Sequence, residues 1–261
     1  MSYGLHMTNG YTSMNRITIL LTATIDPKDT IFVQRNDPKI RENDYINALK
    51  MWLNLIKSNI PSPSLVFCEN SGYNLDRIRY LLDEYKNIKT EVIQFEGNNF
   101  PSELGKGYGE LLIIRYALQN SNIIDSSNYV IKVTGRYFIK NINKMIDVLS
   151  MNNDLYVMSD LKKNLTFADS GIFAFKPHFI LNYLSFFQNY INDSKGFYLE
   201  HALSKAVLRS ISDGHKWLPL PSKPIIIGYS GTSNILYKNS KIRWLVGEAI
   251  HCIKNYLMEN R

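Results

Sequence analysis

Residues 17–25 have the sequence Ile-Thr-Ile-Leu-Leu-Thr-Ala-Thr-Ile. This run is β-branched and almost continuously apolar, which is typical of a strand covered on both faces of a sheet. It therefore predicts a central strand of a parallel sheet. The apolar positions between residues 45 and 56 then fall on one helical stripe, and Pro61 and Pro63 end the element, so we expect a helix after the first strand.

The alternation of strand and helix continues through the first half of the chain. Strand-like runs occupy residues 64–68, 91–95 and 129–134, with helical patterns between them at 75–85 and 108–120. This order predicts a parallel sheet with right-handed crossovers. The remaining pattern is a helix at 142–149, strands at 155–159 and 171–175, helices at 178–190 and 198–211, an extended segment at 224–227 and a helix at 242–258. We expect an α/β fold with a mostly parallel central sheet flanked by helices and a smaller, mixed C-terminal region.

Length and composition favour one domain. The chain has 261 residues, of which 45% are hydrophobic, and a mixed domain of this size commonly stays undivided. Residues 1–14 are polar and aperiodic, so we expect a disordered or cloning-derived leader before two halves, 15–140 and 141–261. No apolar run of about 18 residues and no secretory signal are present, which predicts a cytoplasmic protein. Cys68 and Cys252 suggest neither a disulfide nor a metal site.

The net charge of +7 is spread along the sequence without a block of like charges. Such an excess suits a polyanionic partner. A nucleoside diphosphate, an anionic lipid and a nucleic acid all qualify, so charge alone does not choose among them.

Small polar residues follow the first two predicted strands. The first strand ends at Thr22 and Thr24, the second ends at Glu69 and Asn70, and a Gly-rich helix entry precedes the fourth strand. Ligands of open α/β sheets bind at such carboxyl ends. Residues 16–140 thus resemble the nucleotide-sugar-dependent glycosyltransferases of the GT-A type. The resemblance implies that Thr22, Thr24, Glu69 and Asn70 hold the base and ribose of a nucleotide-sugar donor.

The sequence departs from that family after the fourth strand. The family usually has an Asp-x-Asp motif there, whose carboxylates hold a divalent metal on the diphosphate. This chain has Lys132, Thr134 and Arg136 instead. Because arginine neutralises phosphate directly, we expect Thr134 and Arg136 to bind the donor without a metal, with Mn²⁺ or Mg²⁺ as the alternative. Arg136 in an ordinary salt bridge is an equal interpretation, and Lys132 pointing to solvent or pairing with a carboxylate is another.

Two glycine-containing segments are further candidates for phosphate contact. Residues 105–110 contain Lys106 but match neither GxGxxG nor a P-loop, so a flexible helix entry is the competing interpretation. Residues 228–234 are rich in hydroxyl groups and include Ser230, which we expect to close over phosphates. The segment is not GxSxG, and the histidines have no nucleophile beside them, so a serine hydrolase is disfavoured.

Two carboxylates in the second half are candidate catalytic residues. Asp169 and Ser170 lie in a polar turn before an apolar run, where the resemblance implies contact with sugar hydroxyls. A turn capped by Asp169 is the alternative. Glu200 lies in the first turn of a predicted helix, close to the place where inverting members of the family keep their base. The helix dipole alone also favours a carboxylate there.

The last predicted helix is amphipathic. Its apolar stripe contains residues 242, 245, 246, 249, 250, 253, 256 and 257, with Lys241, Arg243, Lys254 and Arg261 nearby. The stripe either packs on the domain or lies on an anionic membrane where lipid-linked acceptors occur. Glu248 and Glu259 weaken the charge argument.

These features predict an inverting glycosyltransferase that moves a sugar from a nucleotide-sugar donor to a hydroxyl of a glycan or lipid-linked acceptor. A UDP-sugar is the favoured donor. The richness in Asn, Ile, Lys and Tyr indicates a bacterial source, so capsule or lipopolysaccharide assembly is the expected setting, with no nucleic-acid partner. A sugar-nucleotide nucleotidyltransferase is the first alternative, although residues 22–27 lack its Gly-rich basic loop. A catalytically silent nucleotide- or glycan-binding module is the second.

Overall fold

The computed structural model describes residues 15–58, 62–237 and 241–259 of the chain. Its centre is a seven-stranded sheet in the order β10-β6-β9-β4-β1-β2-β3. The strands are β1 (Ile17–Ala23), β2 (Ser64–Glu69), β3 (Thr90–Gln94), β4 (Tyr129–Thr134), β6 (Leu155–Met158), β9 (Ile172–Phe175) and β10 (Lys216–Leu218). Only β9 runs antiparallel to its neighbours, β4 and β6. The α/β fold with a mostly parallel sheet and a mixed C-terminal extension is thereby confirmed.

Strand β1 is the central strand that its sequence predicts. All seven of its residues are buried, and it pairs in parallel with β2 on one side and β4 on the other. In this register Thr22 lies beside both Cys68 and Thr134. The carboxyl ends of β1, β2 and β4 therefore meet at one edge of the sheet.

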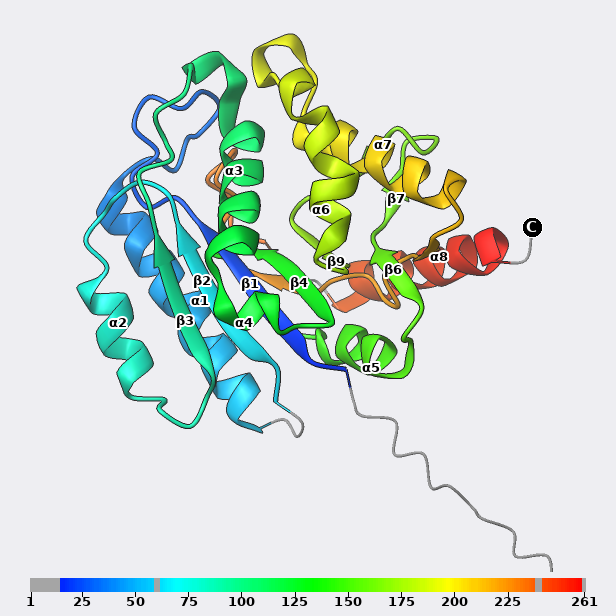
Figure 1. Ribbon diagram of the computed structural model, residues 1–261, viewed down its shortest axis with the longest axis horizontal. Helices are drawn as coiled ribbons and strands as arrows, with labels where there is room; N and C mark the ends of the chain where they lie inside the picture. Colours follow the sequence, from blue (N-terminus) through cyan, green and yellow to red (C-terminus); the bar gives the residue numbers. More distant parts are fainter. Residues whose placement is uncertain (1–14, 59–61, 238–240, 260–261) are drawn as a thin grey trace, which may run out of the picture.

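Helices cover both faces of the sheet (Figure 1). The core on one face receives side chains from α1 (Pro38–Ser58), α2 (Asp76–Asp83) and α5 (Asn143–Met151). The core on the other face receives them from α3 (Gly105–Asn120), α4 (Asn122–Asp125), α6 (His178–Asn182) and α7 (Leu199–Ser212). Leu20 and Leu21 belong to different cores, as the alternation of a strand requires.

Several elements differ from their predicted form. The helix predicted at 178–190 ends after α6 and continues as a 3-10 helix, Leu184–Tyr190. Helix α1 begins at Pro38, a residue that suits the first helical position, and extends the apolar stripe seen in the sequence. The edge strand β10 and two small antiparallel pairs were not predicted: β5 (Phe138–Ile139) with β11 (Ile226–Ile227), and β7 (Leu161–Lys162) with β8 (Phe167–Ala168). Strands this short carry no readable periodicity.

Helix α8 (Lys241–Glu259) closes the described part of the chain, where the sequence predicted it. Within the described residues, no helix has the length and apolarity needed to cross a membrane. Cys68 is buried, Cys252 is exposed, and the two do not form a disulfide. The predicted leader, residues 1–14, lies outside the described ranges, and the division into two halves stays a prediction.

Candidate active site

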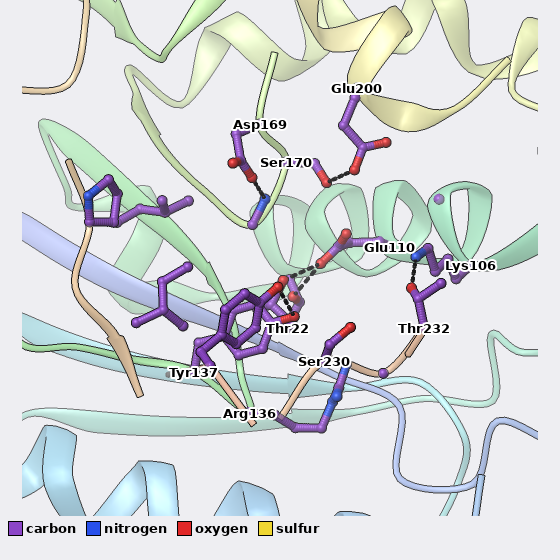
Figure 2. Close-up of a pocket in the computed structure, with 18 of the residues that line it drawn as sticks. Thr22, Lys106, Glu110, Arg136, Tyr137, Asp169, Ser170, Glu200, Ser230 and Thr232 are labelled. Atoms are coloured by element: carbon purple, nitrogen blue, oxygen red, sulfur yellow. Dashed lines mark hydrogen bonds between the residues drawn. The ribbon is translucent and has the colours of Figure 1, made fainter. Parts of the chain in front are cut away.

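A pocket of about 650 Å³ opens at the carboxyl ends of β1 and β4. It is lined by the ends of these strands, the start of α3, the turn before β9, the start of α7, residues 220–237 and one side of α8. Figure 2 shows Arg136 and Glu200 on opposite sides of the pocket, with Glu110 between them. Most of the polar residues singled out in the sequence therefore lie around one cavity.

The floor of the pocket is an ion pair between Glu110 of α3 and Lys132 of β4. The Lys132 Nζ atom is 2.5 Å from Glu110 Oε1 and the same distance from the carbonyl oxygen of Ser170, which accepts its hydrogen bond. Thr22 and Thr134 each donate a hydrogen bond of 3.1 Å to the same Glu110 oxygen. Lys132 thus pairs with a carboxylate, which was one of the two interpretations of the sequence. Its partner, Glu110, is a pocket residue to which the sequence analysis assigned no role.

Electrostatics keep Glu110 ionised. Burial by itself raises the pKa of a carboxyl group, but the Lys132 ammonium and the hydroxyls of Thr22 and Thr134 outweigh it and lower the pKa of Glu110 below its usual value. Glu110 Oε1 receives all the hydrogen bonds that described residues make to this carboxylate. Its second oxygen, Oε2, accepts no hydrogen bond from the described residues.

Arg136 provides the positive charge at the end of β4. The turn that carries it is tight: the Gly135 amide donates to the Thr22 carbonyl at 2.8 Å, and a Cβ atom at Gly135 would lie 2.7 Å from that oxygen. Arg136 is only 8% exposed, and its Nη1 atom donates to the Tyr229 carbonyl at 3.0 Å. Its Nε atom is buried without a hydrogen-bond partner. Among the described residues no carboxylate forms a salt bridge with Arg136. Burial by itself lowers the pKa of the guanidinium group, but Tyr45, Tyr137 and the Asp44 carboxylate outweigh it and raise the pKa.

Two more guanidinium groups lie near Arg136. Arg41 of α1 is buried and donates to backbone carbonyls after β1, including that of Ile25 at 3.1 Å, while burial lowers its pKa. Arg35 pairs with Asp44 at 2.5 Å. The hydrogen bond to Asp44 raises the pKa of Arg35 overall, and the positive charge of Arg136 opposes it; the same charge adds to the effect of burial in lowering the pKa of Arg41. Among the residues that the structure describes, Asp44 is the carboxylate that forms a salt bridge with this cluster, so the three guanidinium groups leave an excess of positive charge that favours an anionic ligand.

Residues 228–234 cover Arg136 from above. A Cβ atom at Gly231 would lie 2.6 Å from Arg136 Nη2, so this loop rests directly on the guanidinium group. Lys106 at the start of α3 donates a hydrogen bond to Thr232 of the same loop, and Ser230 lines the pocket beside it (Figure 2). Both predicted phosphate contacts, Lys106 and Ser230, lie in the pocket with Arg136. Their role in binding stays a prediction.

The opposite wall carries the predicted catalytic carboxylates. Glu200 lies in the first turn of α7, and its Oε1 atom accepts a hydrogen bond of 2.8 Å from Ser170 Oγ. Asp169 accepts the Gly171 amide at 3.0 Å and pairs with Lys162 at 3.1 Å, and the Asp169 and Lys162 side chains are both half-exposed. Asp169 therefore caps its turn, which was the alternative interpretation, and still lines the pocket. Glu200 is the carboxylate with the fewer competing partners.

Glu69 and Asn70 lie beneath the pocket and do not line it. Both are fully buried. Glu69 Oε1 accepts the amide of Ile25 at 3.0 Å, and Asn70 Oδ1 accepts the hydroxyl of Thr24 at 2.6 Å. Burial raises the pKa of the Glu69 carboxyl. In the structure these residues hold the loop after β1, and direct contact with a donor stays a prediction for them, as it does for Thr22 and Thr24, which do line the pocket.

Asp193 is a pocket residue that the sequence did not reveal. It is 3% exposed, accepts the Gly107 amide at 3.4 Å, and burial raises its pKa. Its second oxygen, Oδ1, is buried without a partner. A Cβ atom at Gly105, where φ is +77°, would lie 2.2 Å from Asp193. The absence of a side chain at Gly105 therefore leaves room for the Asp193 carboxylate, and only the tertiary structure reveals this contact.

The residues at the end of β4 do not fit a divalent metal. At the place where the resemblance implies carboxylate ligands, the structure has the buried guanidinium group of Arg136. Throughout the described part of the chain, no three His, Cys, Asp or Glu side chains gather as a metal site would require. Glu110, the nearest carboxylate on the floor, is already bound to Lys132.

No protein-family model matches this sequence, and no curated protein matches it at the sequence level. In three dimensions it is similar to a mannosyltransferase from Pyrobaculum calidifontis in complex with GDP-Man and Mn²⁺, at a TM-score of 0.49 and 10% identity, over 95% of this chain and 65% of that one. This chain thus spans less than two thirds of that protein.

Two other solved structures broaden the comparison. A cytidylyltransferase from Leptospira borgpetersenii has a TM-score of 0.46 and 14% identity, over 95% of this chain and 98% of that one. A glycosyltransferase involved in the glycosylation of the major capsid of PBCV-1 has a TM-score of 0.43 and 10% identity, over 78% of this chain and 81% of that one. At such values the proteins share at most the course of the backbone, and function rests on the residues of this site.

Proposed function

We propose that this protein is a glycosyltransferase that uses a nucleotide-sugar donor. The observation that carries the proposal is Arg136, a buried arginine at the carboxyl end of β4 with no described carboxylate to pair with it and a buried Nε atom without a partner. A buried guanidinium group that pairs with no carboxylate favours an anion, and a phosphate group that enters the pocket neutralises its charge. The pyrophosphate of a nucleotide sugar supplies such an anion, and arginine binds phosphate oxygens bidentately.

The opposite wall supports transfer to a hydroxyl group. In the proposed reaction the acceptor oxygen attacks the anomeric carbon, the bond from that carbon to the phosphate oxygen breaks, and Glu200 removes the acceptor proton. The nucleoside diphosphate leaves with its added charge beside Arg136 and Lys106. Glu110 lies between the two walls (Figure 2), so its Oε2 atom is in position to accept hydrogen bonds from the donor sugar. The proposed reaction inverts the anomeric carbon, because the proposed base, Glu200, and the proposed phosphate contact, Arg136, lie on opposite sides of the pocket.

A metal-independent mechanism follows from the same residues. Arg136 and Lys106 supply the positive charge that the family otherwise obtains from a divalent ion. As donor we favour a UDP-sugar, and as acceptor a hydroxyl of a glycan or lipid-linked sugar in bacterial surface polysaccharide assembly, with the enzyme in the cytoplasm. Thr22, Thr24 and Thr134 are proposed donor contacts, because they line the pocket where the strands end.

A sugar-nucleotide nucleotidyltransferase is the second candidate, and the basic cluster of Arg35, Arg41 and Arg136 is compatible with a nucleoside triphosphate as well. The carboxylate base Glu200 favours glycosyl transfer, because attack on an anomeric carbon by a neutral hydroxyl needs proton removal whereas a sugar phosphate already carries a charged nucleophile.

The experiment is a panel of UDP-, GDP- and CMP-sugars incubated with the protein, in EDTA and in Mn²⁺, with nucleotide release measured. We expect turnover of one donor class in EDTA. Strict dependence on Mn²⁺ would contradict the metal-independent mechanism. Pyrophosphate release from a nucleoside triphosphate and a sugar phosphate, without turnover of any nucleotide sugar, would favour the nucleotidyltransferase instead.

A further inference from the structure

Helix α8 exposes a stripe of large aliphatic side chains. Leu245, Val246, Ile250 and Ile253 are 60%, 57%, 50% and 60% exposed. They recur at the three- and four-residue spacing of one helical face. Isolated exposed aliphatic residues need no explanation, but a continuous row on one helix marks a binding surface. The described residues of the chain leave this row uncovered.

The other face of α8 is fixed to the domain by mostly polar contacts. Trp244 Nε1 donates to the Lys223 carbonyl at 3.1 Å, and Glu248 accepts the Lys223 amide at 2.6 Å and pairs with Lys144 at 3.3 Å. His251 Nε2 lies 2.7 Å from the Leu220 carbonyl oxygen. The helix therefore does pack on the domain, but through Trp244, Glu248 and His251. Turning the aliphatic row inward would break all of these contacts.

The same helix forms part of the pocket wall. Gly247, Ile250 and His251 line the cavity that also contains Glu200 and Asp169. Figure 1 shows α8 on the side of the molecule away from α1 and α2. Ile250 belongs both to the exposed row and to the pocket lining. A surface that covers the row consequently lies next to the pocket, beside the wall assigned to the acceptor.

The positive charge of the protein indicates which kind of partner covers the exposed row. The sequence of α8 includes Lys241, Arg243 and Lys254, and one of its two glutamates, Glu248, is already paired with Lys144. The whole chain carries a net charge of +7. A second copy would bring the same charge to the interface and be repelled, whereas an anionic bilayer attracts it.

We propose that α8 docks this protein on the surface of an anionic membrane. The helix lies in the plane of the headgroups, with Leu245, Val246, Ile250 and Ile253 inserted at the boundary of the acyl chains. The pocket then faces the bilayer, which presents it with a lipid-linked acceptor. The assignment of a lipid-linked acceptor rests on the proposed function, whereas membrane binding itself does not.

The test is co-sedimentation with vesicles of phosphatidylcholine alone and of an equimolar mixture with phosphatidylglycerol, without any sugar donor. The variant Leu245→Gln/Val246→Gln/Ile253→Gln removes most of the row, keeps residues that favour a helix, and leaves the pocket residue Ile250 in place. A matched control, Tyr80→Gln/Met151→Gln/Phe186→Gln, removes exposed apolar side chains elsewhere, which are 71%, 81% and 59% exposed. We expect the first variant to bind the mixed vesicles about tenfold or more weaker than the wild type, and the control to bind equally.

The outcomes separate membrane docking from its alternatives. The proposal would be overturned if the wild-type protein did not co-sediment with the mixed vesicles. It would also be overturned if the α8 variant bound them as well as the wild type does. A dimer in light scattering that the α8 variant abolishes would assign the row to a second copy instead. Nucleotide-sugar hydrolysis by the same variants is measured in solution, so a failure of catalysis and a failure of membrane binding are observed independently.

Discussion

Lys132 Nζ and Glu110 Oε1 lie 2.5 Å apart on the floor of the pocket, joining the middle of β4 to the second turn of α3. The Lys132 side chain is fully buried, and the Glu110 carboxylate also holds the hydroxyls of Thr22 and Thr134. One carboxylate therefore fixes the two central strands and the helix that crosses them. The charged floor of the pocket is at the same time part of the core.

Lys132→Met should destabilise the protein by about 3–5 kcal/mol, because it leaves the Glu110 carboxylate in the interior without its counter-charge. The free energy of unfolding in urea measures this loss. The double variant Lys132→Met/Glu110→Gln removes both charges and should recover a large part of it, since a neutral amide still accepts from Thr22 and Thr134. A double variant no more stable than the single one would show that the pair is not the cause.

Acid should remove the contribution of the Glu110 carboxylate to the free energy of unfolding. Its pKa is lower in the folded protein than in the unfolded chain, so its stabilisation is complete above the unfolded value of about 4.3 and decreases as the pH falls through the folded value. Urea unfolding across this range should show a steeper loss for the wild type than for Lys132→Met/Glu110→Gln. Parallel curves would mean that Glu110 does not contribute to the acid sensitivity.

Arg136→Met should weaken nucleotide diphosphate binding by roughly 1.5–3 kcal/mol, or about ten- to a hundredfold in Kd, because a charge-assisted hydrogen bond to phosphate is lost. Titration calorimetry with UDP and GDP measures it. Arg79→Met is the matched control, since Arg79 is half-exposed on α2 and far from the pocket lining. Equal affinities for the wild type and the Arg136 variant would place the diphosphate elsewhere.

Glu200→Gln should lower kcat of sugar transfer by about 10²- to 10⁴-fold with little change in the donor KM, because the amide keeps the hydrogen bond to Ser170 but accepts no proton. Asp169→Asn tests the competing carboxylate, and a larger loss of kcat in that variant would transfer the role of base to Asp169.

Gly105→Ala should destabilise the protein more than Gly196→Ala. Gly196 has the left-handed conformation, with φ of 74° and ψ of 12°, which costs another residue about 1–2 kcal/mol. Gly105 has φ of 77° and ψ of −174°, a region that is essentially restricted to glycine, so its backbone strain is at least as large. Only at Gly105 does the new Cβ atom meet Asp193, at 2.2 Å, whereas nothing lies within 4 Å at Gly196. Overpacking should add about 1–3 kcal/mol, measured by thermal or urea unfolding. Equal losses would mean that neither the backbone conformation of Gly105 nor its contact with Asp193 adds to the cost.

Six of the seven strands of the sheet were predictable because each one is recorded in its own residues, whereas the three-residue edge strand β10 was not predicted. The buried run at β1 and the alternation of strands and helices identified the parallel core, and the end of β4 at Thr134 placed Arg136 at the edge where ligands bind. Strand alternation also put Lys132 and Thr134 on one side, and their side-chain nitrogen and oxygen are 3.4 Å apart. Periodicity and strand ends are local properties, so a linear sequence contains them.

The partners of these residues were decided only by the tertiary structure. Glu110 meets Lys132 across 22 residues, Asp193 meets Gly107 across 86, and Gly231 closes on Arg136 from a loop late in the chain. The apolar stripe of α8 was visible in the sequence, but its orientation was not. The stripe faces outward because the opposite face of the helix makes hydrogen bonds to the backbone of Lys223 and Leu220. Contacts of this kind depend on how the helices cross the sheet and how the loops close. Residue spacing along the chain does not contain that information, because the same amphipathic pattern packs equally well inward or against another surface.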